Sequence, residues 1–566
     1  MGMSLADPPA VPPRETDVLI AGGGPCGLML ANELGRRGTR AVVVNDKPNT
    51  AFNPQANATQ ARTMEHFRRL GFAEEVRALG MPPNFPTDVA YFTRFSRYEL
   101  ARFPLPSSRE AKQKVGTLGG SWSAAELPHR VSQKFVEPVL RRHAQALPGI
   151  SLHYGWRLLS FSDEGGHVQA EIECLADGRR RTVRSAYLVG ADGASSAVRQ
   201  AMGWRYAGEA GAQRDFMGGR MVALYLRSAA FYEQVRHAPA WMSVSFNRDR
   251  RAFMAAVDGR GEFAFHTQLR PGERGQDITA EDAKAMFHAA VGAQLPVEVL
   301  SLGTWTAGHC LVADAFQQGR VFIGGDAAHL FTPTGGLGYN TAVDDAVNLG
   351  WKLAAVLRHH ADPELLESYT LERRPLALRN TAYARAFADS LGLFEPDPCI
   401  EDETAQGAAA RACAGSYLAA HGRREFDIPG ITFGGRYDGS PAIVADGSAA
   451  PPDAADRYTP TACPGGRAPH LWLDDGVSLY DRFGFEWTLL QLAGSAALPW
   501  QAAAQRRALP LVILRFPSEE ARELYGADLA LIRPDQVVAW RGAADTDPET
   551  VLRRLLGTPA ARGTLQ

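Results

Sequence analysis

The sequence predicts an α/β protein with an inserted antiparallel sheet and a small second α/β domain at the C-terminal end. Three observations carry this prediction. A short apolar strand at 17–21 runs through a glycine turn into a helix and a second strand. Segments that alternate or are rich in aromatic residues fill 205–305. Strand and helix patterns then return after 464. Together they indicate a βαβ domain, an insertion and a separate C-terminal domain.

Composition bounds the class of protein. The chain has 566 residues, enough for about three domains. Its 60 Lys and Arg against 62 Asp and Glu leave no basic excess to attract nucleic acid. No apolar run is long enough to cross a membrane, and the Pro-rich start at 1–13 is expected to be a flexible tail. Six cysteines without a C-x-x-C pair favour free thiols, and we expect a cytoplasmic protein without a metal site.

The first βαβ unit carries a glycine pattern with a physical purpose. The strand at 17–21 enters Gly22-x-Gly24-x-x-Gly27, a helix is expected over 28–37, and a second strand over 40–45. Gly22 permits the tight turn, Gly24 lets a pyrophosphate approach the backbone, and Gly27 allows close packing of helix on strand. This context predicts a dinucleotide site.

An acidic residue about 20 positions further on is expected to hold the adenosine ribose. Asp46 lies at that distance, directly after the second strand. Asn45 precedes it, and its amide can also bond a hydroxyl. The sequence leaves the choice between Asn45 and Asp46 open.

Later elements follow the same reasoning. Helices are expected over 57–70, 133–147 and 341–357, the last from apolar positions at 3–4 spacing. Strands at 187–190 and 321–324 each end in glycine followed by an acid, Asp192 and Asp326. Both acids stand where parallel strands would end, which places them near the glycine turn.

The insertion and the C-terminal region have different characters. Strands of an antiparallel sheet are expected at 221–226, 242–246, 253–257 and 263–269. The Gly/Ala/Pro/Asp-rich stretch 399–463 is expected to be a linker with irregular wrapping segments. Beyond it we expect a strand at 511–516, a hairpin at 530–541 and a final helix at 547–556.

Three motifs in order resemble one enzyme family. They are Gly190-Ala191-Asp192-Gly193, Gly324-Gly325-Asp326 and the block Pro333-x-Gly335-Gly336-Leu337-Gly338-Tyr339-Asn340. With the first glycine pattern they resemble the single-component (class A) FAD-dependent aromatic hydroxylases. The tail, with Pro464-Gly465-x-Arg467 and Arg533-Pro534-Asp535, is similar to the subgroup of phenol and polyketide hydroxylases that ends in a thioredoxin-like domain. Gln536 stands where that subgroup usually has glycine.

The resemblance implies a domain plan. An FAD-binding Rossmann-like domain would span 14–204 and 306–398, and a substrate domain 205–305 with a contribution from about 84–112. The segment 399–463 would link these to a thioredoxin-like α/β domain at 464–566. The family also implies a homodimer.

The resemblance assigns roles to individual residues. Asp192 would lie near the pyrophosphate, and Asp326 would bind the ribityl chain. Backbone N–H groups of the turn at 333–340 would point at the flavin ring, with Asn340 adding a side-chain contact. Arg62 would reach a phosphate and Gln133 would touch the cofactor. The expected FAD-binding residues are Gly22, Gly24, Gly27, Asn45, Asp46, Arg62, Gln133, Asp192, Asp326, Pro333, Gly335, Gly336, Leu337, Gly338 and Asn340.

The resemblance also implies a reaction. A small phenolic or related aromatic substrate would be hydroxylated with NADPH or NADH and O₂, through a C4a-hydroperoxyflavin. No catalytic side chain is identified by sequence. The candidates for the substrate pocket are Asn57, Trp241, His266 and Tyr339.

Two alternatives remain open at this stage. The same fold could carry out epoxidation or Baeyer–Villiger oxidation of a polycyclic polyketide. A non-catalytic dinucleotide-binding interaction protein is the other. The sequence does not identify the substrate, the position of hydroxylation, the preferred nicotinamide cofactor, the oligomeric state or the role of the C-terminal domain.

Overall fold

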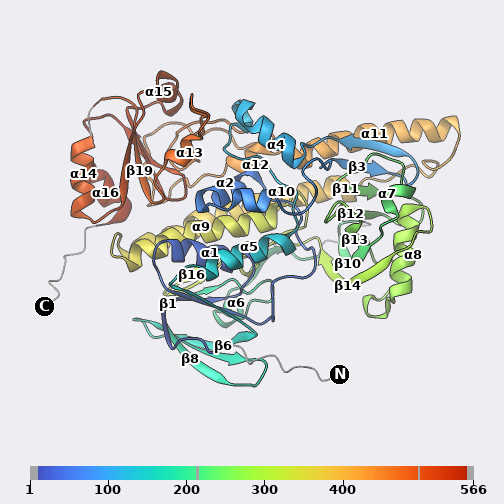
Figure 1. Cartoon of the computed structure of the whole chain (residues 1–566), viewed down its shortest axis with the longest axis horizontal. Helices are drawn as coiled ribbons and strands as arrows, with labels where there is room; N and C mark the ends of the chain where they lie inside the picture. Colours follow the sequence, from blue (N-terminus) through green and yellow to red (C-terminus); the bar gives the residue numbers. More distant parts are fainter. Residues whose placement is uncertain (1–9, 212–215, 495–496, 558–566) are drawn as a thin grey trace.

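The computed structural model describes residues 10–211, 216–494 and 497–557. Figure 1 shows the C-terminal region around β19 at the upper left, the sheet with β1 and β8 below it at the lower left, and the sheet that carries β10 and β14 at the right. Within the described residues, no helix combines the length and the apolar character that crossing a bilayer requires. The expected tail is covered only at 10–13, because 1–9 fall outside the described residues.

The first sheet is built around five parallel strands. Their order is β17-β8-β1-β2-β5, with bounds Val321–Ile323, Arg180–Gly190, Glu15–Ala21, Ala41–Asn45 and Ile150–Tyr154. The antiparallel ribbon β6 (Trp156–Asp163) and β7 (Val168–Cys174) extends it from β8. Strand β2 reads Ala-Val-Val-Val-Asn and its first four residues are buried, as expected for a parallel strand covered on both faces.

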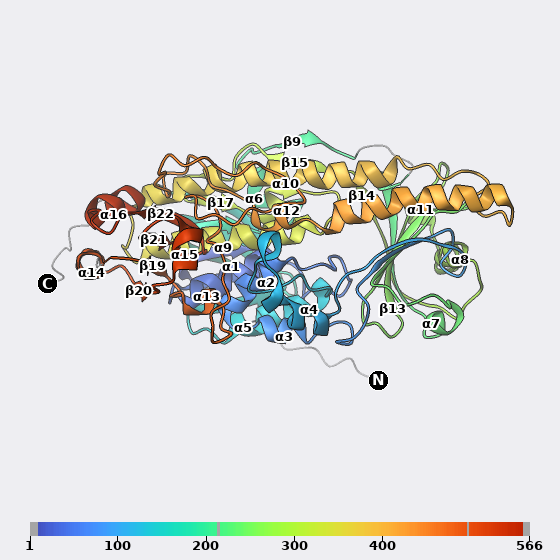
Figure 2. The same ribbon diagram turned by 90° about the horizontal axis from the view of Figure 1, so that it is seen from above.

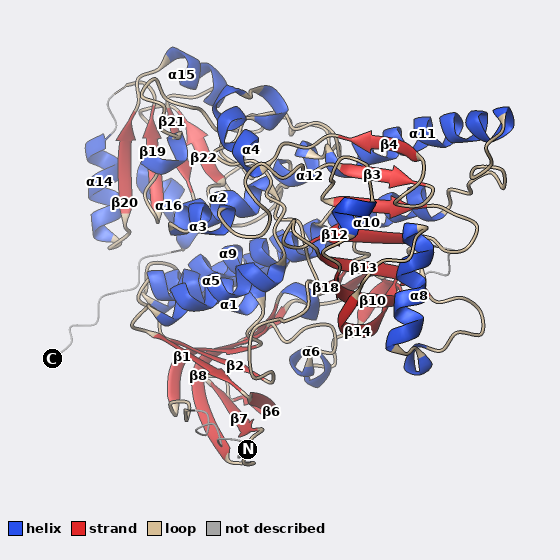
Figure 3. Ribbon diagram, turned by 45° about the vertical axis from the view of Figure 1, so that its right-hand side comes forward, coloured by secondary structure: helices blue, strands red, loops and turns tan. Residues whose placement is uncertain are grey.

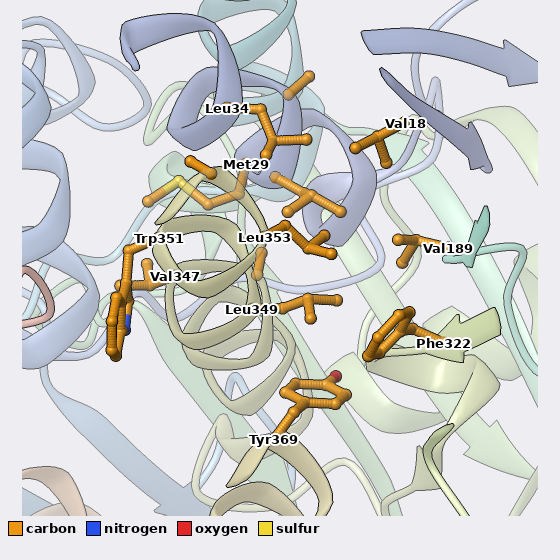
Figure 4. Packing of buried hydrophobic residues seen from close by; sticks show 14 of the residues in the cluster. Val18, Met29, Leu34, Val189, Phe322, Val347, Leu349, Trp351, Leu353 and Tyr369 are labelled. Atoms are coloured by element: carbon orange, nitrogen blue, oxygen red, sulfur yellow. The ribbon is translucent and has the colours of Figure 1, made fainter. Parts of the chain in front are cut away.

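Three helices cover one face of this sheet. Helix α1 (Pro25–Arg36) packs against α5 (Gln133–Gln145) and α9 (Leu337–Leu357), and these helices form a layer beside β1 and β2 (Figure 3). Leu34 and Met29 of α1 approach Leu349 and Leu353 of α9, with Val189 of β8 nearby (Figure 4). Because this core is fully buried, it fixes the height of α1 and α9 over the strand ends that carry the glycine motifs.

The second sheet combines strands from two parts of the chain. Its order is β14-β10-β13-β12-β11-β3-β4. Strands β10–β14 come from Gly219–Arg227, Met242–Ser245, Ala252–Ala256, Glu262–Gln268 and Glu298–Ala307, whereas β3 and β4 are Val89–Phe92 and Glu99–Phe103. Helix α8 (Ala280–Val291) covers one face, where the rings of Phe265 and Phe287 lie 5.7 Å apart. Helix α11 (Ala405–Phe426) packs on β3 and β4 and lies alongside α10 (Ser368–Gly392) (Figure 2).

Helix α11 corrects the prediction of a wholly irregular segment over 399–463. It has 22 residues, and α12 (Pro429–Phe433) follows it. Its alanines are strong helix formers, and Thr404 caps its first turn. Glycine marks close packing here, since a Cβ on Gly415 would lie 2.3 Å from the Leu100 carbonyl oxygen. The sequence interpretation read the glycines of this segment as loop residues, whereas Gly415 lies inside a helix and allows it to pack closely on β4.

The C-terminal region is a mixed sheet with helices. The order is β20-β19-β21-β22, with β20 (Leu511–Arg515) parallel to β19 (Trp487–Gln491) and the hairpin of β21 (Leu529–Ile532) and β22 (Val538–Gly542) antiparallel. Gln536, in the hairpin turn, has a φ of 61°. That left-handed backbone explains why glycine is usual there. The thioredoxin-like comparison stays a prediction.

The remaining elements are short or connect the sheets. They are α2 (Ala61–Leu70), α3 (Ala73–Arg77), α4 (Ser108–Lys114), α6 (Ala197–Ala201), α7 (Phe231–Gln234), α13 (Leu479–Arg482), α14 (Ala497–Arg506), α15 (Glu519–Tyr525), α16 (Pro548–Leu556), β9 (Tyr206–Glu209), β15 (Cys310–Ala313), β16 (Gln317–Gln318), β18 (His329–Leu330) and five short 3₁₀ turns at Val115–Thr117, Gly120–Trp122, Gly275–Asp277, Gly325–Ala327 and Pro363–Glu367.

A buried charge cluster joins the C-terminal region to the first domain. Glu372 on α10 accepts hydrogen bonds from both Nη atoms of Arg533, at 2.7 and 2.9 Å, and from Lys352 Nζ at 2.6 Å. All three side chains are fully buried. Breaking one such pair leaves an uncompensated buried charge, so the cluster specifies how the two regions dock.

Candidate active site

The glycine turn is shaped by contacts that exclude side chains. Gly22 has a φ of 112°, and a Cβ there would lie 2.0 Å from the Ala191 carbonyl oxygen. A Cβ on Gly27 would lie 1.9 Å from the Gly22 oxygen, whereas Gly24 faces open space. Helix α1 begins just after Gly24, without a side-chain cap. Its first N–H groups are therefore free to receive a negatively charged group.

Three separated loops meet at this turn. Ala191 N donates to Ala21 O at 2.7 Å, and Gly324 N donates to Gly190 O at 3.0 Å. A Cβ added to Gly325 would lie 3.1 Å from the Cβ of Cys26. The loops after β1, β8 and β17 thus share the carboxyl edge of one parallel sheet, which is where such sheets bind ligands.

The structure separates the roles of Asn45 and Asp46. The Asn45 side chain turns back toward the glycine turn and accepts a hydrogen bond from Gly23 N at 3.0 Å. Asp46 is exposed just beyond the strand. Tyr154 Oη donates to Gly23 O at 3.0 Å and holds the turn from the neighbouring strand. Asn45 therefore lies at the edge where a ribose would sit.

Asp192 orders its own loop. One carboxylate oxygen accepts from Ala197 N at 2.7 Å and Val198 N at 3.2 Å, and the other accepts from Ser196 Oγ at 2.5 Å. Burial raises the pKa of Asp192 despite these bonds. The acid caps the turn into α6, so its influence on a bound pyrophosphate would act through the position of the loop.

Asp326 is an exposed residue between buried Gly325 and Ala327. Its side chain is exposed to solvent, yet the surrounding protein desolvates the carboxyl enough to raise its pKa, although the charge of His329 acts in the opposite direction. A carboxylate that is accessible and still deep within protein is placed to meet a ligand. Polyhydroxyl chains offer the donors that such a carboxylate accepts.

Asp345 on α9 holds the loop that carries Asp326. It accepts hydrogen bonds from Gly325 N at 3.0 Å, His329 Nε2 at 2.6 Å and Arg373 Nε at 2.8 Å. Burial alone would raise the pKa of Asp345, but the charges and hydrogen bonds of His329 and Arg373 outweigh it and the pKa is lowered. His329 is thus a structural partner of Asp345.

The start of α9 is tied to the segment before α2. Asn340 Oδ1 accepts from Gln60 N at 2.8 Å, and its Nδ2 donates to Ala58 O at 2.9 Å and Gly336 O at 2.6 Å. Gln60 Nε2 donates to Gly335 O at 2.7 Å. These bonds keep 57–60 extended, so α2 begins at Ala61 and not at the predicted 57. Asn340 is therefore committed to positioning the turn.

Unpaired polar atoms collect where the flavin ring is expected. Asn57 Oδ1, Thr59 Oγ1 and Tyr339 Oη are buried and complete no hydrogen bond among the described residues. Burial raises the pKa of Tyr339, whose hydroxyl lies near that of Thr59 without completing a hydrogen bond to it. Gly336, with a φ of 66°, precedes α9 without a side-chain cap. Orphaned buried polar atoms are costly, and a polar ring edge would satisfy them. These residues fit FAD.

The other predicted positions lie around this turn. Gln133 N donates to Ala56 O at 2.6 Å, and its side chain donates to Glu137 Oε1 at 2.5 Å. Pro333 is exposed, Leu337 is buried and Gly338 is partly buried.

Arg62 is bonded to residues of its own chain at the contact with the C-terminal region. Its guanidinium donates to Glu65 Oε2 and Gln536 Oε1, both at 2.8 Å, and to Asp535 O at 2.6 Å. Arg467 also bonds Glu65. These partners belong to the contact with the C-terminal region and leave Arg62 committed there. The phosphate role stays a prediction, and these contacts favour a structural role for Arg62 instead.

The two candidates on the substrate sheet occupy different surroundings. Trp241 is buried, stands edge-on to Phe426 of α11 with ring centroids 6.0 Å apart, and its Nε1 has no partner among the described residues. His266 stacks on Phe253 at 4.6 Å and accepts from Trp305 Nε1 at 3.2 Å. Burial lowers the pKa of His266 to about 4, so it is neutral near pH 7. His266 is part of the sheet's packing, whereas Trp241 keeps a free donor.

Sequence reasoning missed two residues beside the flavin turn. Glu425, at the end of α11, accepts from Gly335 N at 2.8 Å and pairs with His421 at 2.8 Å. Arg130 is buried beside Trp241. No motif marks either position. Asp345 was visible as an acid inside an apolar helix pattern, a signal that points to a buried partner.

Comparisons with known proteins place these motifs in a family. Residues 15–384 match the FAD binding domain family, and 461–559 match the aromatic-ring hydroxylase C-terminal family. The FAD-dependent monooxygenase apdD of Emericella nidulans is 30% identical over 93% of this chain and 87% of its own length. The 2,4-dichlorophenol 6-monooxygenase of Cupriavidus pinatubonensis is 30% identical over 97% and 98%. The solved structure of chromopyrrolic acid-soaked RebC with bound 7-carboxy-K252c matches with a TM-score of 0.86 at 32% identity, covering 96% of this chain and 100% of that one.

Proposed function

Because the chain belongs to the FAD-binding aromatic-ring hydroxylase family and is an FAD-dependent flavoprotein monooxygenase, we propose that it hydroxylates a phenolic or polyketide-type aromatic substrate. NAD(P)H is the reductant. For each turnover one O₂, one NAD(P)H and one proton yield the hydroxylated ring, NAD(P)⁺ and water. When bound, FAD supplies the transfer of two electrons and the activation of O₂.

The observation that carries the proposal is a direct connection between the loops expected to bind FAD and aromatic residues of the second sheet. The segment Asn57–Gln60 pairs with the strip before α5 through the Thr59 and His129 backbones, at 2.8 and 2.9 Å. That strip continues into Arg130, which stacks on Trp241 of the substrate sheet. The Thr59–His129 pairing thus connects the segment with the unpaired Asn57 and Thr59 oxygens to Arg130 and Trp241. We propose that the aromatic ring binds where these polar atoms and aromatic side chains meet.

The protein's residues would bind, orient and exclude water. The uncapped start of α9 presents backbone N–H groups and the positive end of its dipole, which stabilise negative charge on the reduced ring. Asn340 and Gln60 hold that start in place. Tyr339 and Asn57 offer their unpaired oxygens to the ring edge. Buried apolar side chains of the second sheet keep bulk water away from the reacting atoms.

The setting of the enzyme belongs to the same proposal. All six cysteines are free, which agrees with a reducing cytoplasm. A homodimer rests on the family alone. For the C-terminal region we propose a thioredoxin-like structural domain without dithiol chemistry, since its sequence has no C-x-x-C pair.

The test is a panel of phenols, naphthols and polycyclic phenols offered to the purified flavoprotein. We expect a yellow protein whose consumption of NAD(P)H rises when its aromatic partner is present. The product should gain one oxygen atom, and NMR should show a new phenol. An epoxide or a ring-expanded ester of the same mass would instead favour the epoxidation or Baeyer–Villiger alternative. A colourless protein that takes up no FAD would refute the proposal.

A further inference from the structure

Arg130 is a buried guanidinium without a polar partner. Its side chain lies in the strip between His129 and α5, and the residue is 5% exposed. Its Nη1 is buried and makes no hydrogen bond, and Arg130 takes part in no ion pair, within residues 10–211, 216–494 and 497–557. Leaving a buried cation unpaired is costly. Such a residue is retained most readily where a ligand supplies the missing acceptor.

Two aromatic rings hold the guanidinium in place. Its central carbon lies 4.6 Å from the Trp241 ring centroid and 5.7 Å from that of Phe426. These contacts restrict the plane of the guanidinium while leaving its N–H groups directed along that plane. The Trp241 indole Nε1 is a second buried donor without a partner among the described residues. Three parts of the chain thus bring two buried, unpaired donors together with two aromatic rings.

The nearby acid does not neutralise Arg130. Glu425 accepts a hydrogen bond from Gly335 N at 2.8 Å through one carboxylate oxygen, and its other oxygen lies 2.8 Å from His421 Nε2 without completing a hydrogen bond. Among the described residues, Glu425 forms no ion pair with Arg130. Its charge favours the protonated form of Arg130, but burial dominates and lowers the pKa of Arg130 to about 10. Arg130 is therefore still a cation near pH 7. Glu425 also accepts a hydrogen bond from Gly335 N, so it connects the surroundings of Arg130 with the turn that leads into α9.

We propose that Arg130 and Trp241 form a subsite that binds an anionic oxygen carried by the aromatic substrate. The inference rests on the proposed function and adds the class of substrate: an aromatic carboxylate or an ionised phenol. A guanidinium matches either group, and it can contact a carboxylate through two parallel N–H bonds. The indole N–H supplies a further donor, and the Trp241 and Phe426 rings accommodate the adjoining ring system. A neutral analogue would leave the cation unpaired and bind more weakly.

The experiment measures binding to the oxidised holoenzyme through the perturbation of its flavin absorption spectrum. The probes are 1-hydroxy-2-naphthoate, the matched neutral 1-hydroxy-2-naphthamide, and pentafluorophenol below and above its own pKa, which lies well below that of Arg130. The variants are Arg130→Gln, Arg130→Lys and Trp241→Phe. Arg142→Gln is the matched control, because Arg142 is exposed on α5 and pairs with Glu75 at the surface.

We expect Arg130→Gln to weaken naphthoate binding about 10- to 100-fold, the range for a charge-assisted hydrogen bond in a buried site. Naphthamide binding should change by less than about 3-fold, because the neutral amide forms no ion pair with Arg130 that the variant could lose. Arg130→Lys should recover part of the loss, and Trp241→Phe should cost about 3- to 10-fold for the anion. Arg142→Gln should bind as the parent does. If only ionised pentafluorophenol depends on Arg130, the natural anion is a phenolate; if naphthoate does, it is a carboxylate.

Equal effects of Arg130→Gln on the acid and the amide would overturn the subsite. So would a parent protein that binds neither anion more tightly than its neutral form. If Arg130→Gln fails to retain FAD, Arg130→Lys and Trp241→Phe take its place. A loss of affinity for the acid alone supports the subsite, and equal losses for the acid and the amide overturn it. Hydroxylation of neutral aromatics without any preference for anions would remove this inference and leave the proposed function intact. Binding of the anions without turnover of any aromatic compound would support the subsite and refute the proposed function.

Discussion

Replacing Asp345 with asparagine tests whether a buried acid in α9 positions the loop of Asp326. The variant keeps the shape of the side chain and removes its charge. Arg373, which donates to Asp345 at 2.8 Å and is 1% exposed, then loses its close buried counterion. Breaking a buried pair in this way costs about 3–5 kcal/mol. Gly325 N and His329 Nε2 bond one Asp345 oxygen and Arg373 Nε bonds the other, so the NH₂ of asparagine would face existing donors at one of these two positions.

The assay combines thermal unfolding with flavin content. We expect Asp345→Asn to lower the free energy of unfolding by about 3–5 kcal/mol and to release FAD at least about tenfold more readily. Asp344→Asn is the matched control, because that neighbouring side chain is 30% exposed and lies 3.3 Å from His66 and 4.0 Å from Arg373, which is farther from Arg373 than Asp345 is. It should cost about 1 kcal/mol or less. Equal losses for the two variants would refute the reasoning.

The pKa shift of Asp345 predicts how its contribution to the free energy of unfolding changes with pH. Because the folded protein lowers the pKa of Asp345, the acid stabilises the fold fully above its unfolded pKa of about 3.9. That contribution is lost as the pH falls through the folded pKa. The difference in stability between the parent and Asp345→Asn should therefore be constant near neutral pH and shrink only in acid. A difference that vanished near neutral pH would contradict this assignment.

Three further predictions follow from single contacts. Gly336→Ala should weaken FAD binding about tenfold, because a left-handed backbone costs about 1–2 kcal/mol and the new Cβ meets Ala58 at 2.9 Å. Gly178→Ala, at a similar φ in open space, should change stability and leave FAD affinity unaltered; flavin fluorescence distinguishes them. Arg62→Gln should lower the melting temperature through the loss of about 3 kcal/mol while FAD affinity stays unchanged, and FAD loss at an unchanged melting temperature would support the phosphate role. Tyr339→Phe should leave the flavin-free protein equally stable or more stable by about 1 kcal/mol yet weaken FAD binding, and titration with FAD checks it.

The sequence determined the features that depend on neighbours along the chain. The glycine turn after the first strand, the Val-rich second strand and the strands of 221–268 follow from local periodicity and turn geometry. The order of the motifs around Asp192 and Asp326 placed both acids at strand ends, and the loops do meet there. Even Gln536 was visible as a position where glycine is usual, and its positive φ supplies the reason.

Only the tertiary structure decided which side chains meet. Arg62 bonds Gln536 across 474 residues of sequence, and no local pattern specifies a partner so distant. Arg130, Trp241 and Phe426 come from a loop, a sheet and a helix end, and each has an ordinary neighbourhood in the sequence. Asn340 carries a family motif, yet packing turned its amide inward to hold the flavin turn. Local propensity selects the elements, whereas burial and the need to pair every buried polar group decide their contacts, and those depend on the whole fold at once.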